Sequence, residues 1–180
     1  MRHNCGVEAV ELCDFIRDLG DYVPELNAAE TLEFVAPRMH YVSLDSNAFL
    51  PCCLDWRAEI RLGVMESHVG DPDVVVGHVD FLVLQLGHEP ADLVLAEFSE
   101  EARRFADLFD GSWLASDVEE EGCFAAAASI DVVMIVLDVV VDESARGHQL
   151  GAWAVSEAGR DDVAHLGGVG GDVSALGCGV

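Results

Sequence analysis

The chain of 180 residues contains no lysine, and its nine basic residues, all arginine, are outnumbered by 34 acidic residues, which gives a formal net charge of −25. A surface of this sign repels phosphate backbones and anionic bilayers over long distances. We therefore expect neither nucleic acid nor a membrane as a partner. Cationic partners are favoured, although the same acidity also fits a purely solubilising role in a salty cytoplasm, or a GC-rich genome that uses arginine in place of lysine.

Long apolar runs and closely paired cysteines are also missing. The most apolar stretch, 124–141, is interrupted by Asp131 and Asp138, which predicts a buried strand with its lead-in rather than a membrane span. No uninterrupted apolar segment follows residues 1–5, so we expect no secretion and a cytoplasmic protein. The six cysteines show no two-residue spacing of the zinc or redox kind, which predicts reduced thiols and no metal site: Cys5, Cys13, Cys52, Cys53, Cys123 and Cys178.

An apolar share of 51% excludes a largely disordered chain and is enough for a sizeable core. We expect an N-terminal helical segment over 1–57 and a core over 58–180, within one compact domain. Helical spacing in the first part is found over 7–19 and 28–35. Residues 40–56 have no clear period, and we predict an irregular segment with at most a short strand over 40–44.

The middle of the chain predicts an antiparallel hairpin. From Glu59 the residues alternate, with Ile60, Leu62 and Val64 on one face, and a second alternating run covers 74–86 after an acidic turn. In that run Val75, Val79, Phe81 and Val83 are expected on one side. His78 and Asp80 are expected on the other side, where they form either a proton relay or part of a solvated sheet face.

Helical spacing returns over 98–109, with Ser99 placed to cap an acidic first turn. An acidic loop is predicted over 117–122, where the triplet 119–121 either attracts a cationic substrate or is simply solvated. The run 132–141 is apolar on both sides apart from Asp138, which is typical of a central strand covered by helices.

A short polar turn connects this central strand to the next helix. The helix is expected over 149–158, and 172–176 is expected to return as a parallel strand through a right-handed crossover. Because the first turn of a helix has amide groups without partners and a positive dipole end, the turn before it suits a phosphate-bearing cofactor. The alternative is an ordinary strand-to-helix connection capped by Ser144.

The residues Val141-Asp142-Glu143 and Arg146-Gly147-His148-Gln149-Leu150-Gly151 resemble the pattern of the GNAT acetyltransferase superfamily. Gln149 stands where the family most often has glycine. The resemblance is strongest over 132–157 and implies an α/β (α+β) fold. Such a fold has a mixed, mostly antiparallel central sheet flanked by helices, with a pyrophosphate-binding loop between the central strand and a helix.

The resemblance also implies acetyl-coenzyme A as cosubstrate. By resemblance, Val139 and Val141 offer backbone groups to the pantetheine arm. The pyrophosphate is implied to lie on the amides of Arg146, Gly147, His148, Gln149, Leu150, Gly151 and Ala152. The implied activity is acetyl transfer to an amine of a small molecule or a protein by direct attack.

Such a transfer needs a base for the ammonium proton. Asp138 is the only carboxylate inside the central strand, where burial would strengthen it as a base, but alternation also allows it to face a helix and pair with Arg104 or Arg160. Glu66 is the second candidate base, because the end of that strand often borders the acceptor cleft in the family.

Family members continue after the last strand with a helix and two strands that often supply a tyrosine as general acid. Neither tyrosine of this chain, Tyr22 or Tyr41, lies near that position. We therefore expect the N-terminal residues or a second subunit to complete the site, with a homodimer formed through the edge of the terminal strand. The alternative is a truncated, catalytically inactive relative, an acidic module that acts through protein contacts.

Overall fold

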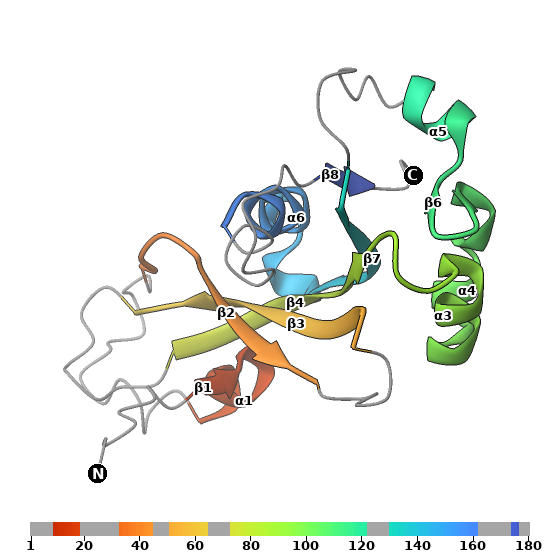
Figure 1. Ribbon diagram of the computed structural model, residues 1–180. Helices are drawn as coiled ribbons and strands as arrows, with labels where there is room; N and C mark the ends of the chain where they lie inside the picture. Colours follow the sequence, from red (N-terminus) through yellow and green to blue (C-terminus); the bar gives the residue numbers. More distant parts are fainter. Residues whose placement is uncertain are drawn as a thin grey trace, which may run out of the picture.

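The computed structural model describes residues 9–18, 33–44, 51–64, 73–121, 130–161 and 174–176, and in these ranges a mixed six-stranded sheet forms the centre (Figure 1). The strand order is β2 (Arg38–Ser43), β3 (Cys53–Leu62), β4 (Asp73–Gln85), β7 (Val132–Val141) and β8 (Ser174–Leu176). The pairs β2–β3, β3–β4 and β4–β7 are antiparallel, β8 is parallel to β7, and β1 (Ala9–Glu11) pairs with β4 in parallel. The expected α+β class with a mostly antiparallel sheet is confirmed.

Helices cover both faces of β7 (Figure 1). On one side α6 (Leu150–Asp161) packs Ala154 and Ala158 against Phe81 and Met134, and α1 (Leu12–Arg17) adds two residues to the same apolar cluster. The other side is covered by α3 (Ala91–Phe98) and α4 (Glu100–Arg103). They are followed by the short elements η1 (Ala106–Leu108), β5 (Phe109–Asp110), β6 (Trp113–Leu114) and α5 (Ser116–Glu121). No helix among the described residues is both long and apolar enough to cross a membrane.

The sheet contains two bulges that shift the alternation of side chains. Ile60 pairs with Gly77 but Arg61 pairs with Val75, so Val76 is an extra residue in β4. As a result Val76, not Val75, joins the cluster that contains Val79, and the expectation that Val75 shares their face is wrong. The second bulge lies in β7, where Leu137 is extra between the partners of Asp80 and Phe81.

The expected hairpin is confirmed as β3 and β4, and the central strand, the following helix and the parallel last strand are confirmed as β7, α6 and β8. The short strand expected over 40–44 is confirmed as β2, which begins two residues earlier. Residues 70–72 of the expected turn, and residues 172–173 ahead of β8, lie outside the described part of the chain.

The helical prediction for the N-terminal segment 1–57 differs from the structure. Its described residues contain β1, the short helix α1, all of β2 and the first half of β3, so the expected division at residue 57 falls inside a strand. Phe34 forms a bridge with Val64 instead of ending a helix. The spacing of apolar residues in this segment did not reveal strands, because their partners lie elsewhere in the chain.

Two predictions between β4 and β7 are also wrong in part. Ser99 does cap a helix, since its hydroxyl accepts a hydrogen bond from the Ala102 N–H at 3.0 Å. Its extended backbone, however, separates α3 from the four-residue α4, so no continuous helix covers 98–109. The acidic residues 117–121, expected in a loop, belong to α5, where carboxylates in the first turn interact favourably with the helix dipole.

Candidate functional site

Among the described residues, only the first half of the outer edge of β7 is paired with another strand. β8 pairs only with Val133, Met134 and Ile135, and no other described strand pairs with that edge. The Asp142 N–H donates to the Val76 carbonyl of β4 at 2.9 Å. Because consecutive residues of a strand direct their backbone groups to opposite edges, those of Val139 and Val141 lie on the open edge.

Two of these edge groups are bonded only to neighbouring side chains. The Val139 N–H donates to the Asp138 carboxylate at 2.8 Å, and the Val141 carbonyl accepts from Arg146 Nε at 3.0 Å. Both partners are exposed side chains that can rotate away at little cost. The open edge therefore has backbone donors and acceptors available to an extended ligand.

The connection from β7 to α6 begins with a tightly bonded turn. Asp142 caps the short helix η2 (Glu143–Ala145), and its carboxylate accepts the Ser144 N–H at 2.9 Å as well as the Ser144 hydroxyl. These hydrogen bonds lower the pKa of Asp142. Ser144 is thus a donor within the turn, and the expected capping of α6 by Ser144 is wrong.

Two residues of the loop have positive φ angles, Gly147 at 87° and Gln149 at 58°. Gln149 also provides the carbonyl that accepts the first helical hydrogen bond, from the Trp153 N–H at 3.0 Å. Its backbone thus has the conformation that favours glycine, at the position where the resemblance leads one to expect glycine. In the part of the chain that the structure describes, no side chain accepts from the N–H groups of Leu150, Gly151 or Ala152.

Gly151 lets the start of α6 lie against β7. A Cβ atom at this position would be 3.1 Å from Val139 Cγ1 and 3.6 Å from Val141 Cγ2. Its missing side chain therefore faces the strand, whereas Ala152 is exposed on the first turn. The structure thus brings together all the residues expected at the cofactor: Val139 and Val141 on β7, 146–149 in the loop and 150–152 in the first turn.

Of the two candidate bases, the structure describes Asp138 but not Glu66. Asp138 lies on β7 beside the bulge, but its expected burial is wrong because the side chain is exposed. Its bond is to the Val139 N–H and not to Arg104 or Arg160. Glu66 lies outside the described residues.

His78 and Asp80, the polar pair on β4, lie on the same sheet face as Asp138. Asp138 stands directly opposite Asp80 in the register of β4 and β7. Asp80 is held by Arg57 through two hydrogen bonds of 2.7 and 2.8 Å. His78 Nε2 is 3.8 Å from Asp80 Oδ2, which is too long for a hydrogen bond. The two residues share a face as expected, but no hydrogen bond joins them as a proton relay would require.

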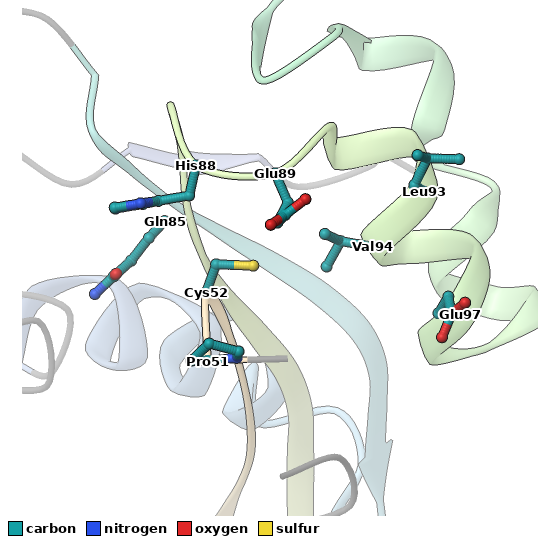
Figure 2. A pocket seen from close by; sticks show the side chains of 8 residues that line it. All are labelled: Pro51, Cys52, Gln85, His88, Glu89, Leu93, Val94 and Glu97. Carbon is teal, nitrogen blue, oxygen red and sulfur yellow. The ribbon is translucent and has the colours of Figure 1, made fainter. Parts of the chain in front are cut away.

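A cavity of about 460 Å³ lies at the other end of β4, between the start of β3 and α3 (Figure 2). Its lining residues come from three short stretches of sequence: Pro51, Cys52, Gln85, His88, Glu89, Leu93, Val94 and Glu97. Burial raises the pKa of the Cys52 thiol, and the nearby Glu89 carboxylate raises it further. Figure 2 shows the His88 ring pointing away from Cys52, so the two do not form a nucleophile and base pair.

Sequence reasoning missed this cavity because no local pattern joins its residues. A group of three or more His, Cys, Asp or Glu side chains suited to a metal ion is absent from the described ranges. No family model, curated protein or solved structure matches the chain.

Proposed function

We propose that the protein binds acetyl-coenzyme A along the open edge of β7 and at the start of α6, and transfers the acetyl group to an amine. The observation that carries the proposal is the backbone of Val139 and Val141, which lies on a strand edge that no described strand covers, immediately before a helix start whose N–H groups have no side-chain partner among the described residues. An extended amide-containing arm pairs with a strand edge, and a pyrophosphate suits the helix start. The GNAT-like order of strand, loop and helix supports the same interpretation.

The fit of the loop to a diphosphate depends on the backbone more than on charge. The positive φ angles of Gly147 and Gln149 turn the chain sharply ahead of α6, and Arg146 is the arginine within the loop. Acidic residues lie close by, at Asp142 and Glu143. Binding of a phosphate group here therefore relies on the amides and the helix dipole.

In the proposed reaction the neutral amine attacks the thioester carbonyl, the new C–N bond forms, and the C–S bond breaks to release the thiolate. Asp138 is the proposed acceptor of the ammonium proton, which ends on the leaving thiolate or in water. The Val139 N–H is a donor for the developing oxyanion once the Asp138 carboxylate turns away from it.

The cofactor part of the proposal is tested by thermal denaturation with acetyl-coenzyme A. At a hundredfold excess over Kd, a bound ligand stabilises the native state by about 2.7 kcal/mol. We expect Ala152→Asp to abolish this stabilisation, because its carboxylate repels the diphosphate, while the first turn of the helix tolerates the acid. Ala152→Asn is the matched neutral control and should still respond. An unchanged melting temperature of the wild-type protein would overturn the proposal.

The transfer step is tested by chromatographic detection of free coenzyme A with a panel of primary amines. We expect Asp138→Asn to lower kcat/KM by about a hundredfold or more, with cofactor binding retained. If the protein binds acetyl-coenzyme A but transfers the acetyl group to none of the amines, the result would favour the alternative function, an inactive acidic module that acts through protein contacts.

A further inference from the structure

The cavity beside α3 is separate from the proposed cofactor site. One of its lining residues, Gln85, pairs with Val132 at the start of β7, whereas the α6 loop follows Val141 at the end of that strand. At 3.3 Å per residue the two ends of β7 are about 30 Å apart. What the cavity binds can therefore be inferred independently of acetyl-coenzyme A.

One wall of the cavity is apolar. Val94 is buried with 2% exposure, and Leu93 beside it is 60% exposed, so this wall presents apolar surface to the solvent. The Cys52 residue is only 5% exposed, and its sulfur is directed into the same space (Figure 2). The volume of about 460 Å³ is within the range of small-molecule sites.

The lining also carries two exposed carboxylates, Glu89 in the loop after β4 and Glu97 on α3, the helix that forms the apolar wall. Glu89 and Glu97 are not among the ion pairs of the described residues, and the nearby Arg103 pairs with Glu100. In Figure 2 the Glu89 carboxylate is turned toward the Cys52 sulfur and Val94. A carboxylate beside a buried thiol and an apolar wall selects a ligand with a positive charge and an apolar body.

We propose that this cavity binds a primary alkylammonium ion, with its ammonium group at the Glu89 carboxylate and its alkyl chain against Leu93 and Val94. The ammonium group has three N–H donors, and carboxylates are acceptors only, so the hydrogen bonds are charge-assisted. The alkyl chain covers the exposed part of Leu93 and removes apolar surface from water.

Saturation-transfer NMR with hexylammonium chloride tests the proposal, with hexanol and hexanoate as neutral and anionic probes of the same length. We expect binding of hexylammonium alone, and a loss of about tenfold or more in affinity in the double variant Glu89→Gln/Glu97→Gln. Since the whole protein attracts cations, Asp92→Asn/Asp107→Asn is the matched control, which removes the same charge outside this cavity. It should bind hexylammonium like the wild type in 0.15 M salt.

The location is tested by alkylation of Cys52 with N-ethylmaleimide, followed by peptide mass spectrometry. Hexylammonium should slow the modification of Cys52 at least threefold and leave the exposed Cys13 unaffected. Equal binding of hexanol or hexanoate, or equal losses of affinity in the two double variants, would overturn the proposal. If Cys52 does not react at all, the NMR comparison of the two double variants decides alone.

Discussion

Gln149 shows how one residue stores strain where a ligand is proposed to bind. An L-residue in the left-handed region costs roughly 1–2 kcal/mol, because its Cβ crowds the backbone, whereas glycine adopts this conformation freely. The φ angle of 58° at Gln149 is set by the turn into α6, whose first helical hydrogen bond starts from its carbonyl. The strain is thus tied to the position of the N–H groups that follow it.

Gln149→Gly should therefore raise the free energy of unfolding by about 0.5–1 kcal/mol, after the greater entropy of glycine in the unfolded chain is included. Urea unfolding followed by tryptophan fluorescence measures the change. The control is His148→Gly in the same loop, which has no positive φ to relieve and should lower stability slightly. Equal shifts in the two variants would show that Gln149 is not strained.

At the scale of elements, the contact between β4 and β7 depends on a single missing side chain. A Cβ atom at Gly77 would lie 2.3 Å from the Val140 carbonyl oxygen, and the clash is with backbone, which cannot rotate away. Gly77 also stands next to the bulge at Val76. Any larger residue has to push the two strands apart next to the open edge of β7.

We expect Gly77→Ala to lower the free energy of unfolding by about 3 kcal/mol, at the upper end of the range for overpacking. Gly111→Ala is the comparison: its φ is 63°, but no atom lies within 4 Å of the added Cβ, so only backbone strain of about 1 kcal/mol is expected. Chemical denaturation of both variants gives the two values. A smaller loss for Gly77→Ala than for Gly111→Ala would contradict the close approach.

The elements that could be predicted are those whose own residues carry the signal. β7 is apolar on both faces, and the loop before α6 combines glycine, arginine and a helix start, so both were visible in the sequence. The beginning of β3 was missed although Leu54 and Trp56 alternate with Asp55 and Arg57, because the polar partner of Arg57 is Asp80 on the next strand.

Bulges and cavities depend on register and packing between distant segments. Val76 differs in no chemical way from Val75, and only the pairing with β3 determines which of them faces the core. The cavity beside α3 likewise combines Cys52 with Glu89 and Glu97, which no spacing rule connects. Burial of Asp138 was wrongly expected because the buried residues of β7, Val133 to Ile135, lie in its first half and Asp138 lies beyond them.

At the scale of the whole molecule, the net charge of −25 opposes folding. Compacting so many like charges raises their mutual repulsion, and several of the few arginines are already paired with single acids, as Arg38 is with Asp73 at 2.6 Å. Salt screens this repulsion, since the Debye length falls from about 10 Å at 0.1 M to about 3 Å at 1 M.

The melting temperature should consequently rise by roughly 5 °C or more between 0.05 and 0.5 M NaCl, as measured by scanning calorimetry. Sucrose of the same osmolality is the control for effects that do not involve charge. A melting temperature that falls with salt, or that rises equally in sucrose, would show that repulsion between the acidic residues does not limit stability.

The long excursion between β4 and β7 also affects how the chain acquires its structure during synthesis. β3 and β4 are close in sequence and can pair as soon as both have left the ribosome, but β7 follows only after the segment 86–131. Until then one side of the valine-rich β4 has unpaired backbone groups, an edge that another nascent chain can join. The helices α3 and α4 are synthesised before β7, and their packing against Leu82 and Leu84 covers the apolar face of β4 on that side of the sheet.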